Sequence, residues 1–118
     1  LAMGNRVVLI PSEASPLIAT DLYQVIETSD MPAGVINIVT GSSTTLAKTL
    51  AEHDDVDGVW AFGEAPLSAL VETASVGNLK RTFVDHGIIT DWFDKQKAEG
   101  LRWLDEAVDI KNIWIPYG

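Results

Sequence analysis

The stretch that decides the fold is residues 4–13, which read GNRVVLIPSE. A strand is predicted over Arg6–Ile10, because an apolar run rich in β-branched residues stops abruptly at Pro11. A helical pattern follows, with Ser15 as a candidate N-cap and Pro16 at the favoured first helical position. A buried strand that turns directly into a helix is the first step of a β-α-β unit. In open α/β folds, ligands bind at the carboxyl edge of such strands.

The alternation of strand and helix continues along the chain. Three further strands are predicted, at Val35–Val39, Val59–Phe62 and Lys80–Val84. The segments between strands carry apolar residues at helical spacing that are expected to face the core: Ile18, Leu22, Val25, Ile26, Leu46, Ala47, Leu50, Ala51, Leu67, Leu70, Val71 and Ala74. Ser43 is a candidate cap of the second helix, and Gly77-Asn78 is predicted to end the third in left-handed conformations. This order predicts a Rossmann-like α/β fold, a parallel sheet with helices on both faces.

Residues 92–118 follow a different pattern from residues 1–91. Trp92, Phe93 and Trp103 lie in a stretch of interrupted helical spacing. Large aromatic side chains are most often core or interface anchors, so these three are expected to cap the surface of the α/β unit. The two segments are therefore predicted to pack together as one domain.

The chain is predicted to close with a strand at Asn112–Ile115. Pro116 ends this strand, and proline in a sheet is typical of an edge position. An edge strand exposes unpaired backbone groups, which makes it a template for pairing with another chain. Trp114 is accordingly expected to lie at an interface.

The totals of the sequence limit the function. The chain has 118 residues and a formal net charge of −9, which argues against binding nucleic acid through its phosphates. No apolar run approaches the roughly 20 residues of a membrane span, and no basic-then-apolar leader precedes the first strand. The first residue is Leu1, and we interpret the chain as a piece of a longer protein or the product of a partial gene.

Two features of the composition bear on metal binding and catalysis. An acidic cluster, formed by Glu52, Asp54, Asp55 and Asp57, is most simply a solvated helix end and loop, and a divalent-cation site is the alternative. Cysteine is absent, which excludes disulfides, thiolate metal sites and a cysteine nucleophile in this chain. The absence of cysteine also fits a cytoplasmic protein.

Four segments resemble the aldehyde dehydrogenase superfamily. Residues 4–13 are similar to the superfamily's GNTVVLKPSE and differ at Arg6 and Ile10. The other segments are residues 31–39 (MPAGVINIV), similar to LPPGVVNIV; 56–59 (VDGV), similar to VDKV; and 78–81 (NLKR), similar to the approach to the general-base strand. They occur in family order and spacing over residues 1–91. The resemblance implies an NAD-binding domain of the Rossmann type.

The end of the chain resembles a narrower group, the long, two-unit aldehyde dehydrogenases of class sixteen. This resemblance depends on residues 78–87 (NLKRTFVDHG) and 111–118 (KNIWIPYG). In that group the second unit is a degenerate copy of the enzyme that has lost most of its catalytic domain. The resemblance implies that Asn112–Ile115 is an oligomerisation strand. It also implies two partners, a second copy in a dimer and the rest of a longer chain.

The resemblance also implies a reaction, the oxidation of an aldehyde to an acid with NAD or NADP. In the family a cysteine attacks the carbonyl and a glutamate activates the hydrolytic water. The cysteine has no counterpart here, and the general-base position falls on Asp85, whose side chain is one methylene shorter. A reacting group displaced by about 1 Å loses on the order of a hundredfold in rate. We predict no intact catalytic residue, and Asp85 with His86 lacks the third ligand of a metal site.

The cofactor-binding positions implied by the resemblance are Pro11, Ser12, Glu13, Gly63 and Glu64. The family's lysine that contacts the adenosine ribose or its phosphate is replaced by Ile10, which offers neither charge nor hydrogen bond. Glu64 places a negative charge where the pyrophosphate rests on a helix N-terminus. At about 4 Å and intermediate dielectric, this repulsion is worth a few kcal/mol. Binding of NAD or NADP is predicted to be weak or lost.

We interpret the chain as a family domain that is non-catalytic alone and that assembles subunits through Asn112–Ile115 by β-augmentation. The alternative is the NAD(P)-binding half of an active enzyme whose cysteine comes from another segment or chain. A third interpretation, a phospho-receiver-like module, requires acids after the first strand and an aspartate ending the third. Those strands end at Ile10-Pro11 and Phe62-Gly63 instead.

Overall fold

Strands and helices alternate up to residue 84 in the computed structural model, which describes residues 1–88 and 90–117. The elements are β1 (Val7–Leu9), α1 (Ile18–Glu27), β2 (Ile36–Ile38), α2 (Ser43–Glu52), β3 (Gly58–Ala61), α3 (Ala65–Ala74), a 3-10 turn η1 (Ser75–Asn78), β4 (Arg81–Val84), α4 (Lys95–Ala98) and α5 (Leu101–Asp105). Each of the four strands predicted in this part forms. Three are shorter than predicted, and β3 has the predicted length but begins one residue earlier. The α/β class is therefore confirmed.

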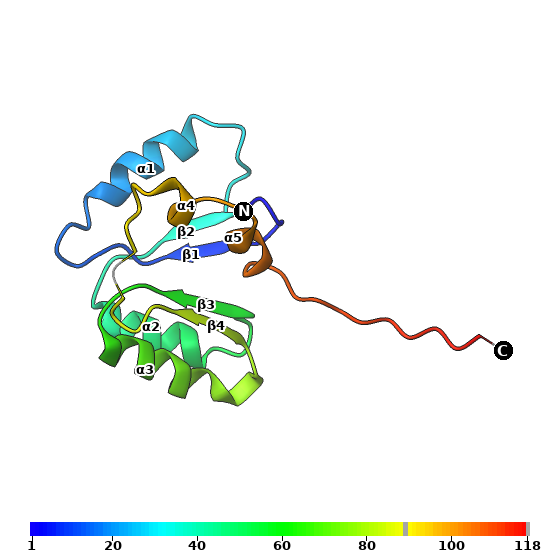
Figure 1. The fold of residues 1–118 in the computed structure, drawn as a ribbon. Coiled ribbons are helices and arrows are strands. Elements are labelled where there is room, and N and C mark those ends of the chain that lie inside the picture. Colours follow the sequence, from blue (N-terminus) through cyan, green and yellow to red (C-terminus); the bar gives the residue numbers. More distant parts are fainter. Residues whose placement is uncertain (89, 118) are drawn as a thin grey trace.

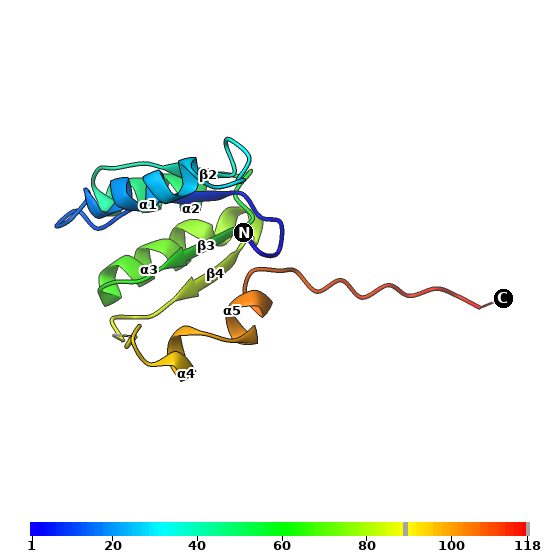
Figure 2. The ribbon, with the colours of Figure 1, turned by 90° about the horizontal axis from the view of Figure 1, so that it is seen from above.

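The four strands form two parallel pairs. β1 pairs with β2 in a register that sets Val7 opposite Ile36, and β3 pairs with β4 in a register that sets Gly58 opposite Arg81. Figure 1 gives the spatial order β2, β1, β3, β4, and Figure 2 shows α2 and α3 beside these strands. The chain therefore reverses its direction of growth between β1 and β3. Such a topological switch point is where open α/β sheets bind ligands.

The core lies between β3, α2 and α3. Its buried side chains are Ala47, Val59, Ala61 and Val71, with Val56, Leu67 and Val84 packed against them. Val71 has no exposed surface, and Ala51 of α2 is only 1% exposed. Burial of such apolar side chains is worth roughly 25 cal/mol for each Å² removed from water. The predicted inward faces of α2 and α3 are confirmed at Ala47, Ala51 and Val71.

The predicted inward face of α1 is confirmed only at Ile26, which is half-buried. Ile18 is 68% exposed and Val25 is 66% exposed, whereas Ala19 is the buried residue of this helix. The face that meets the rest of the domain therefore holds Ala19 and Ile26, and it is displaced from the predicted stripe. Periodicity locates an apolar stripe on a helix but does not show whether this chain contains the surface that would cover it.

Two predicted helix caps are also displaced. Leu17 precedes α1 without a side-chain cap, and the N–H of Ile18 donates to the carbonyl of Ser15 at 3.3 Å. The chain therefore enters α1 through tight i to i+3 turns, and the side chain of Ser15 is not the cap. The cap of α2 is Ser42, whose hydroxyl accepts from the N–H of Thr45 at 3.5 Å. Ser43, the predicted cap, is instead the first helical residue.

The end of α3 differs from the prediction by one residue. The helix continues as η1 to Asn78, and the left-handed residue is Leu79, with φ of 58°. The side-chain amide of Asn78 donates to the carbonyls of Asp54 (2.9 Å) and Val56 (3.4 Å). Asn78 therefore anchors the loop before β3, and the change of direction falls on the next residue.

The segment after β4 covers one face of the strands with aromatic rings. Trp103 lies 5.5 Å from Phe83 and 5.8 Å from Trp60, measured between ring centroids, and Trp92 lies 5.2 Å from Phe62. The predicted cap is therefore formed by Trp92 and Trp103. Phe93, the third predicted member, is 97% exposed and points away from this cluster. Its N–H donates to the Asp91 carboxylate at 3.1 Å, in a local turn that directs the side chain outward.

The predicted strand Asn112–Ile115 does not form among the residues that the structure describes. Residues 110–117, which we name the C-terminal arm, are extended and pair with none of the strands in residues 1–88 and 90–117. Figure 1 shows the arm projecting away from the domain. A strand requires a neighbouring backbone to pair with, and the arm lies beyond the reach of β1–β4 in this conformation. Among residues 1–88 and 90–117, no helix is long and apolar enough to cross a lipid bilayer.

Candidate functional site at the carboxyl edge of the strands

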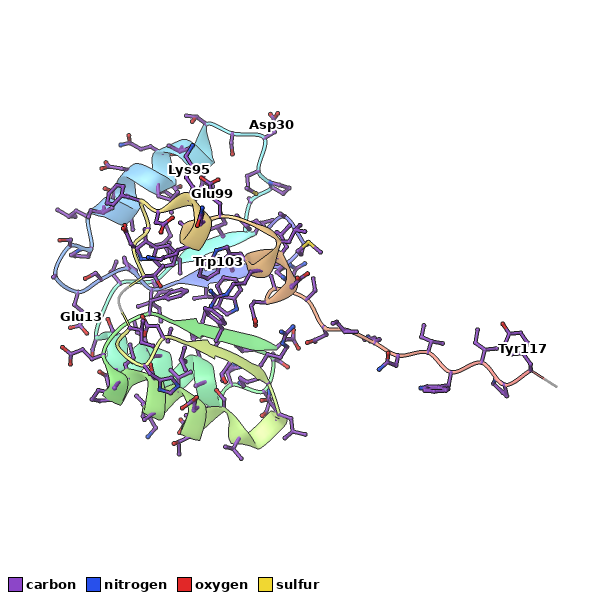
Figure 3. All side chains as sticks on the ribbon, viewed as in Figure 1. Glu13, Asp30, Lys95, Glu99, Trp103 and Tyr117 are labelled. Carbon is purple, nitrogen blue, oxygen red and sulfur yellow. The ribbon has the colours of Figure 1, made fainter. Side chains whose placement is uncertain are left out.

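The turn after β1 and the loops after β3 and β4 gather the predicted site residues. Pro11 is half-buried at the end of β1, and Ser12 is exposed, with its carbonyl accepting the N–H of Ser15 at 3.1 Å. Figure 3 shows Glu13 at this edge and Tyr117 at the opposite end of the molecule. The candidate site and the C-terminal arm therefore lie at opposite ends of the strands.

Glu13 connects the turn after β1 to the start of α2. Its Oε1 accepts a hydrogen bond from the N–H of Ser43 at 2.5 Å. The first amides of a helix have no partner within the helix, and its dipole favours a negative charge there. The carboxylate therefore stabilises the N-terminus of α2. One of the two oxygens of Glu13, a cofactor-binding position by the resemblance, is therefore occupied by the chain itself.

Asp85 connects the ends of β4 and β3. Its Oδ1 and Oδ2 accept the N–H of Gly63 at 3.0 Å and 3.2 Å, and Oδ1 also accepts the N–H of Gly87 at 3.3 Å. The side chain is half-buried. Next to it, the N–H of His86 donates to the hydroxyl of Ser68 at 3.0 Å. The carboxylate that the resemblance places at the general-base position is therefore held against backbone amides.

Gly63 and Glu64 form the connection from β3 to α3. Glu64 precedes the helix in an extended conformation, its side chain is exposed, and its carbonyl accepts the N–H of Leu67 at 3.0 Å. A side chain at Gly63 would place its Cβ 3.2 Å from Leu67, so glycine keeps this connection close to the helix. The structure therefore brings Gly63 together with Asp85, while Glu64 points to solvent.

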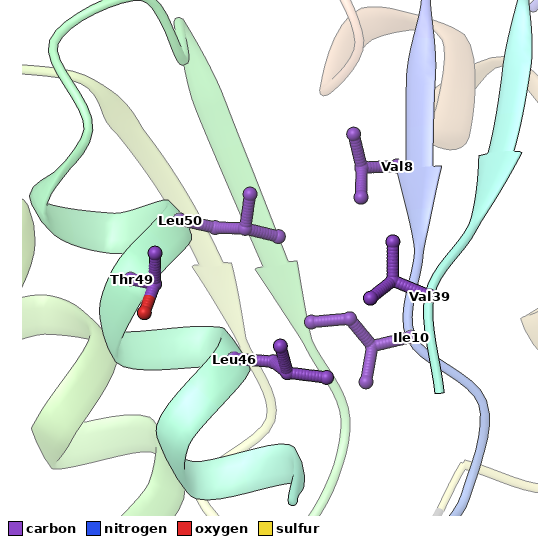
Figure 4. A pocket seen from close by; sticks show the side chains of 6 residues that line it. All are labelled: Val8, Ile10, Val39, Leu46, Thr49 and Leu50. Atoms are coloured by element: carbon purple, nitrogen blue, oxygen red, sulfur yellow. The ribbon is translucent and has the colours of Figure 1, made fainter. Parts of the chain in front are cut away.

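Ile10 lies in a different environment from the other site residues. It lines an apolar cavity of about 60 Å³ between the β1–β2 pair and α2. The remaining lining residues are Val8, Val39, Leu46, Thr49 and Leu50. Figure 4 shows the side chains of Ile10 and Val39 directed toward Leu46 and Leu50 of α2. The residue that the resemblance places at the family's lysine position therefore contributes to packing between a strand and a helix.

An open hollow of about 560 Å³ lies beside Glu13. Its other lining residues are Pro16, Leu17, Thr20, Thr40 and Gly41. Sequence reasoning missed Thr20 and Thr40. Thr40 follows directly after the predicted strand Val35–Val39, and that position at the carboxyl edge was a signal that could have identified it.

The structure also bears on the metal sites that were considered. The members of the acidic cluster are all exposed: Glu52, Asp54, Asp55 and Asp57. His86 contacts the carboxylate of Glu72 at 3.3 Å, with both side chains about half exposed. Within the part of the chain that the structure describes, no three histidine, aspartate or glutamate side chains converge on one point.

The sequence matches the model of the aldehyde dehydrogenase family over residues 1–91. Aldehyde dehydrogenase 1A1 of Mus musculus is 39% identical, in an alignment that covers 100% of this chain and 22% of that protein. The NADP/NAD-dependent aldehyde dehydrogenase PuuC of Escherichia coli is 36% identical, over 83% of this chain and 21% of that protein. The chain thus spans about a fifth of the length of these relatives.

Solved structures of aldehyde dehydrogenases are also similar to this chain. An indole-3-acetaldehyde dehydrogenase from P. syringae, in complex with NAD+, has a TM-score of 0.66 and 39% identity. The alignment covers 71% of this chain and 17% of that one. An aldehyde dehydrogenase of Pseudomonas syringae in complex with NAD+ and octanal has a TM-score of 0.65 and 36% identity, over 68% and 16% of the two chains.

Proposed function

The chain belongs to the aldehyde dehydrogenase family, and we propose that this segment is non-catalytic alone and assembles subunits through its C-terminal arm. The oxidation of an aldehyde with NAD(P) would then belong to other parts of a longer protein or to a partner chain. The observation that carries the proposal is the arm itself. It is extended, apolar and unpaired, and it leaves from the end of the strands opposite to the candidate site.

Two features support the non-catalytic part of the proposal. The chain contains no cysteine, which is the nucleophile that the family uses. Asp85, which the resemblance places at the general-base position, accepts hydrogen bonds from the N–H groups of Gly63 and Gly87. A general base must come within about 3 Å of the proton that it abstracts, so a carboxylate held by two amides is poorly placed for this task.

The shape of the arm supports the assembly part. Trp114 is 89% exposed and Ile113 is 83% exposed, and such side chains are costly to leave in water unless another surface covers them. An extended segment with unpaired backbone groups is suited to adding a strand to the sheet of another subunit. The partner in this proposal is a second copy, in a dimer.

Removal of residues 111–118 tests the assembly proposal. The full chain is expected to sediment as a dimer and the shortened chain as a monomer, with the far-ultraviolet circular dichroism of the domain retained. If the shortened chain also sediments as a dimer, assembly does not depend on the arm.

The alternative function is the NAD(P)-binding half of an active enzyme. The hollow beside Glu13 favours it, as do the relatives whose structures contain NAD+. Calorimetric titration with NAD and with NADP at low salt distinguishes the two. Saturable binding below about 100 µM that is lost in Glu13→Ala would favour the alternative, whereas no heat in a stable dimer supports an assembly role. Such an affinity corresponds to about 5.5 kcal/mol, which the Glu64 charge is expected to reduce.

Two finer proposals go with this function. The resemblance of residues 78–87 and 111–118 to the class-sixteen enzymes supports a place in the second unit of a two-unit chain. The matched relatives include the cytosolic 10-formyltetrahydrofolate dehydrogenase of Xenopus tropicalis, at 33% identity over 74% of this chain and 10% of that protein. Its name supports a cytoplasmic location for the protein that contains this segment.

A further inference from the structure

The segment between α5 and the C-terminal arm is held by one arginine. Arg81, the first residue of β4, donates hydrogen bonds from Nη1 to two backbone carbonyls, and its guanidinium pairs with two carboxylates. The partners are the carbonyls of Asp105 (3.4 Å) and Val108, and the carboxylates of Glu106 (3.2 Å) and Asp109 (3.7 Å). A guanidinium has five donors in a fixed planar fork, so one side chain can hold several acceptors at once.

A second side chain acts on the same segment. The Nδ2 of Asn5, just before β1, donates to the carbonyl of Ala107 at 2.6 Å. Asn5 and Arg81 precede or begin two different strands, at the same end of the domain. We name these two residues the arm clamp. Because the clamp contacts the backbone on both sides of Ala107, it fixes the direction in which the chain leaves the domain.

Beyond the clamp, the apolar side chains of the arm are exposed to solvent. Its large hydrophobic residues are each at least 69% exposed: Ile110, Ile113, Trp114, Ile115 and Tyr117. Figures 1 and 3 show the arm continuing outward from α5, with Tyr117 far from the rest of the domain. The arm therefore lies away from the strands of its own domain.

The same domain offers competing places for the arm. Among the described residues, β2 and β4 each pair with a single strand, so each has an outer edge with unpaired backbone groups. An arm joined by a flexible base would meet these edges at an effective concentration in the millimolar range. In a micromolar solution of the protein, this effective concentration exceeds the concentration of a second copy. Pairing between copies therefore requires that the arm be held away from its own domain.

We propose that Arg81 is the positioning residue that directs the C-terminal arm to a second copy of this chain. The clamp prevents the arm from folding back, so that its strand-forming residues remain available for a partner. This inference rests on the proposed assembly function and adds the residue that selects the partner. Arg81 does not contact the partner in this proposal, because its guanidinium binds the base of the arm.

The test measures the dimer dissociation constant of the full chain by sedimentation equilibrium. Arg81→Gln is expected to raise this constant at least tenfold, because the released arm pairs with its own domain. Arg6→Gln removes the same charge from an exposed side chain near β1 and is the matched control, with an expected change of less than twofold. Removal of residues 111–118 is measured in parallel.

The outcomes separate the two proposals. If removal of the arm leaves the dimer intact, or if the full chain is monomeric, the assembly function fails, and this inference fails with it. If removal abolishes the dimer while Arg81→Gln changes the constant by less than twofold, the role of Arg81 is overturned and the assembly function stands.

Two further measurements test the proposal in case Arg81→Gln does not fold. Asn5→Ala removes one hydrogen bond of the clamp and is expected to raise the dissociation constant about threefold; an unchanged constant would overturn the proposal. The second uses a fluorescent thiol label on Tyr117→Cys, a unique site because the chain has no cysteine. In dilute monomer, iodide is expected to quench this label about half as well when Asn5→Ala or Arg81→Gln lets the arm fold back. Equal quenching would contradict the proposal.

Discussion

The carboxylate of Asp85 accepts the backbone N–H of Gly63 through both of its oxygens, at 3.0 Å and 3.2 Å. This contact joins the residue after β4 to the second residue after β3. A side chain that the family resemblance places at a catalytic position therefore serves as an anchor between two loops. The loops after β3 and β4 also approach each other at Gly87, where a Cβ would lie 3.4 Å from the amide nitrogen of Ala65.

Asp85→Ala is expected to lower the free energy of unfolding by about 1–3 kcal/mol. The substitution leaves the half-buried N–H of Gly63 without its acceptor, and the cost is that of an unsatisfied donor. Urea unfolding followed by circular dichroism measures the change. Asp55→Ala, at an exposed acid of the loop before β3, is the control and is expected to change stability by less than about 0.5 kcal/mol. Equal stabilities of the two variants would show that the anchor has no energetic role.

Ile10→Lys, which restores the family's residue type, is expected to lower the free energy of unfolding by about 2 kcal/mol or more. Ile10 faces an apolar cavity of about 60 Å³ beneath α2, where an ammonium group has no partner. Ile10→Met, which keeps the side chain apolar, is the control and is expected to cost less than about 1.5 kcal/mol.

The same variant has a second readout in calorimetric titration with NADP. Because the side chain of Ile10 is directed toward α2, the lysine is not expected to improve cofactor binding. A tolerated lysine that increases the affinity for NADP would mean that this position turns toward the carboxyl edge after all.

Glu13→Ala is expected to lower the free energy of unfolding by about 0.5–2 kcal/mol. The substitution removes the acceptor of the Ser43 N–H at the start of α2. Hydrogen exchange at the Ser43 amide is expected to become faster, because the amide loses its partner. Glu27→Ala, at the C-terminus of α1, removes the same charge from a position that the helix dipole disfavours, so it is expected to be neutral or slightly stabilising. An unchanged exchange rate at Ser43 would count against a capping role for Glu13.

Much of the fold follows from local patterns in the sequence. The four strands and the inward residues Ala47 and Val71 were predictable because short apolar runs and helical spacing are read within a few residues. The exposure of Ile18 and Val25 in α1 was not predictable in this way. Its stripe at Ile18 and Val25 satisfies the same rule, but the surface that would cover it is absent from the described residues.

The candidate site was predictable as a set of positions but not as a set of contacts. The resemblance placed Gly63 at a cofactor position and Asp85 at a catalytic one, and neither role indicates that the two bind each other. Their contact depends on the approach of two loops that are 22 residues apart in sequence. Likewise, replacement of a lysine by Ile10 indicated a lost contact, whereas the structure shows packing against α2.

Trp114 and Phe93 allow a matched test of the arm, because both are aromatic and highly exposed, at 89% and 97%. They differ in place, since Trp114 lies in the arm and Phe93 lies in the turn before α4. Trp114→Ala is expected to weaken the dimer at least tenfold, because buried tryptophans dominate the binding energy of interfaces. Phe93→Ala is expected to change the dimer dissociation constant by less than twofold.

The two results together locate the contact between copies. A loss confined to Trp114→Ala places the arm in the interface, as the assembly proposal requires. A loss confined to Phe93→Ala would move the interface to the surface beside α4 and leave the arm without a role in the dimer. Because neither side chain contributes to the buried core, both variants are expected to keep the stability of the domain. A change in the dissociation constant can then be read as a change in contacts between copies.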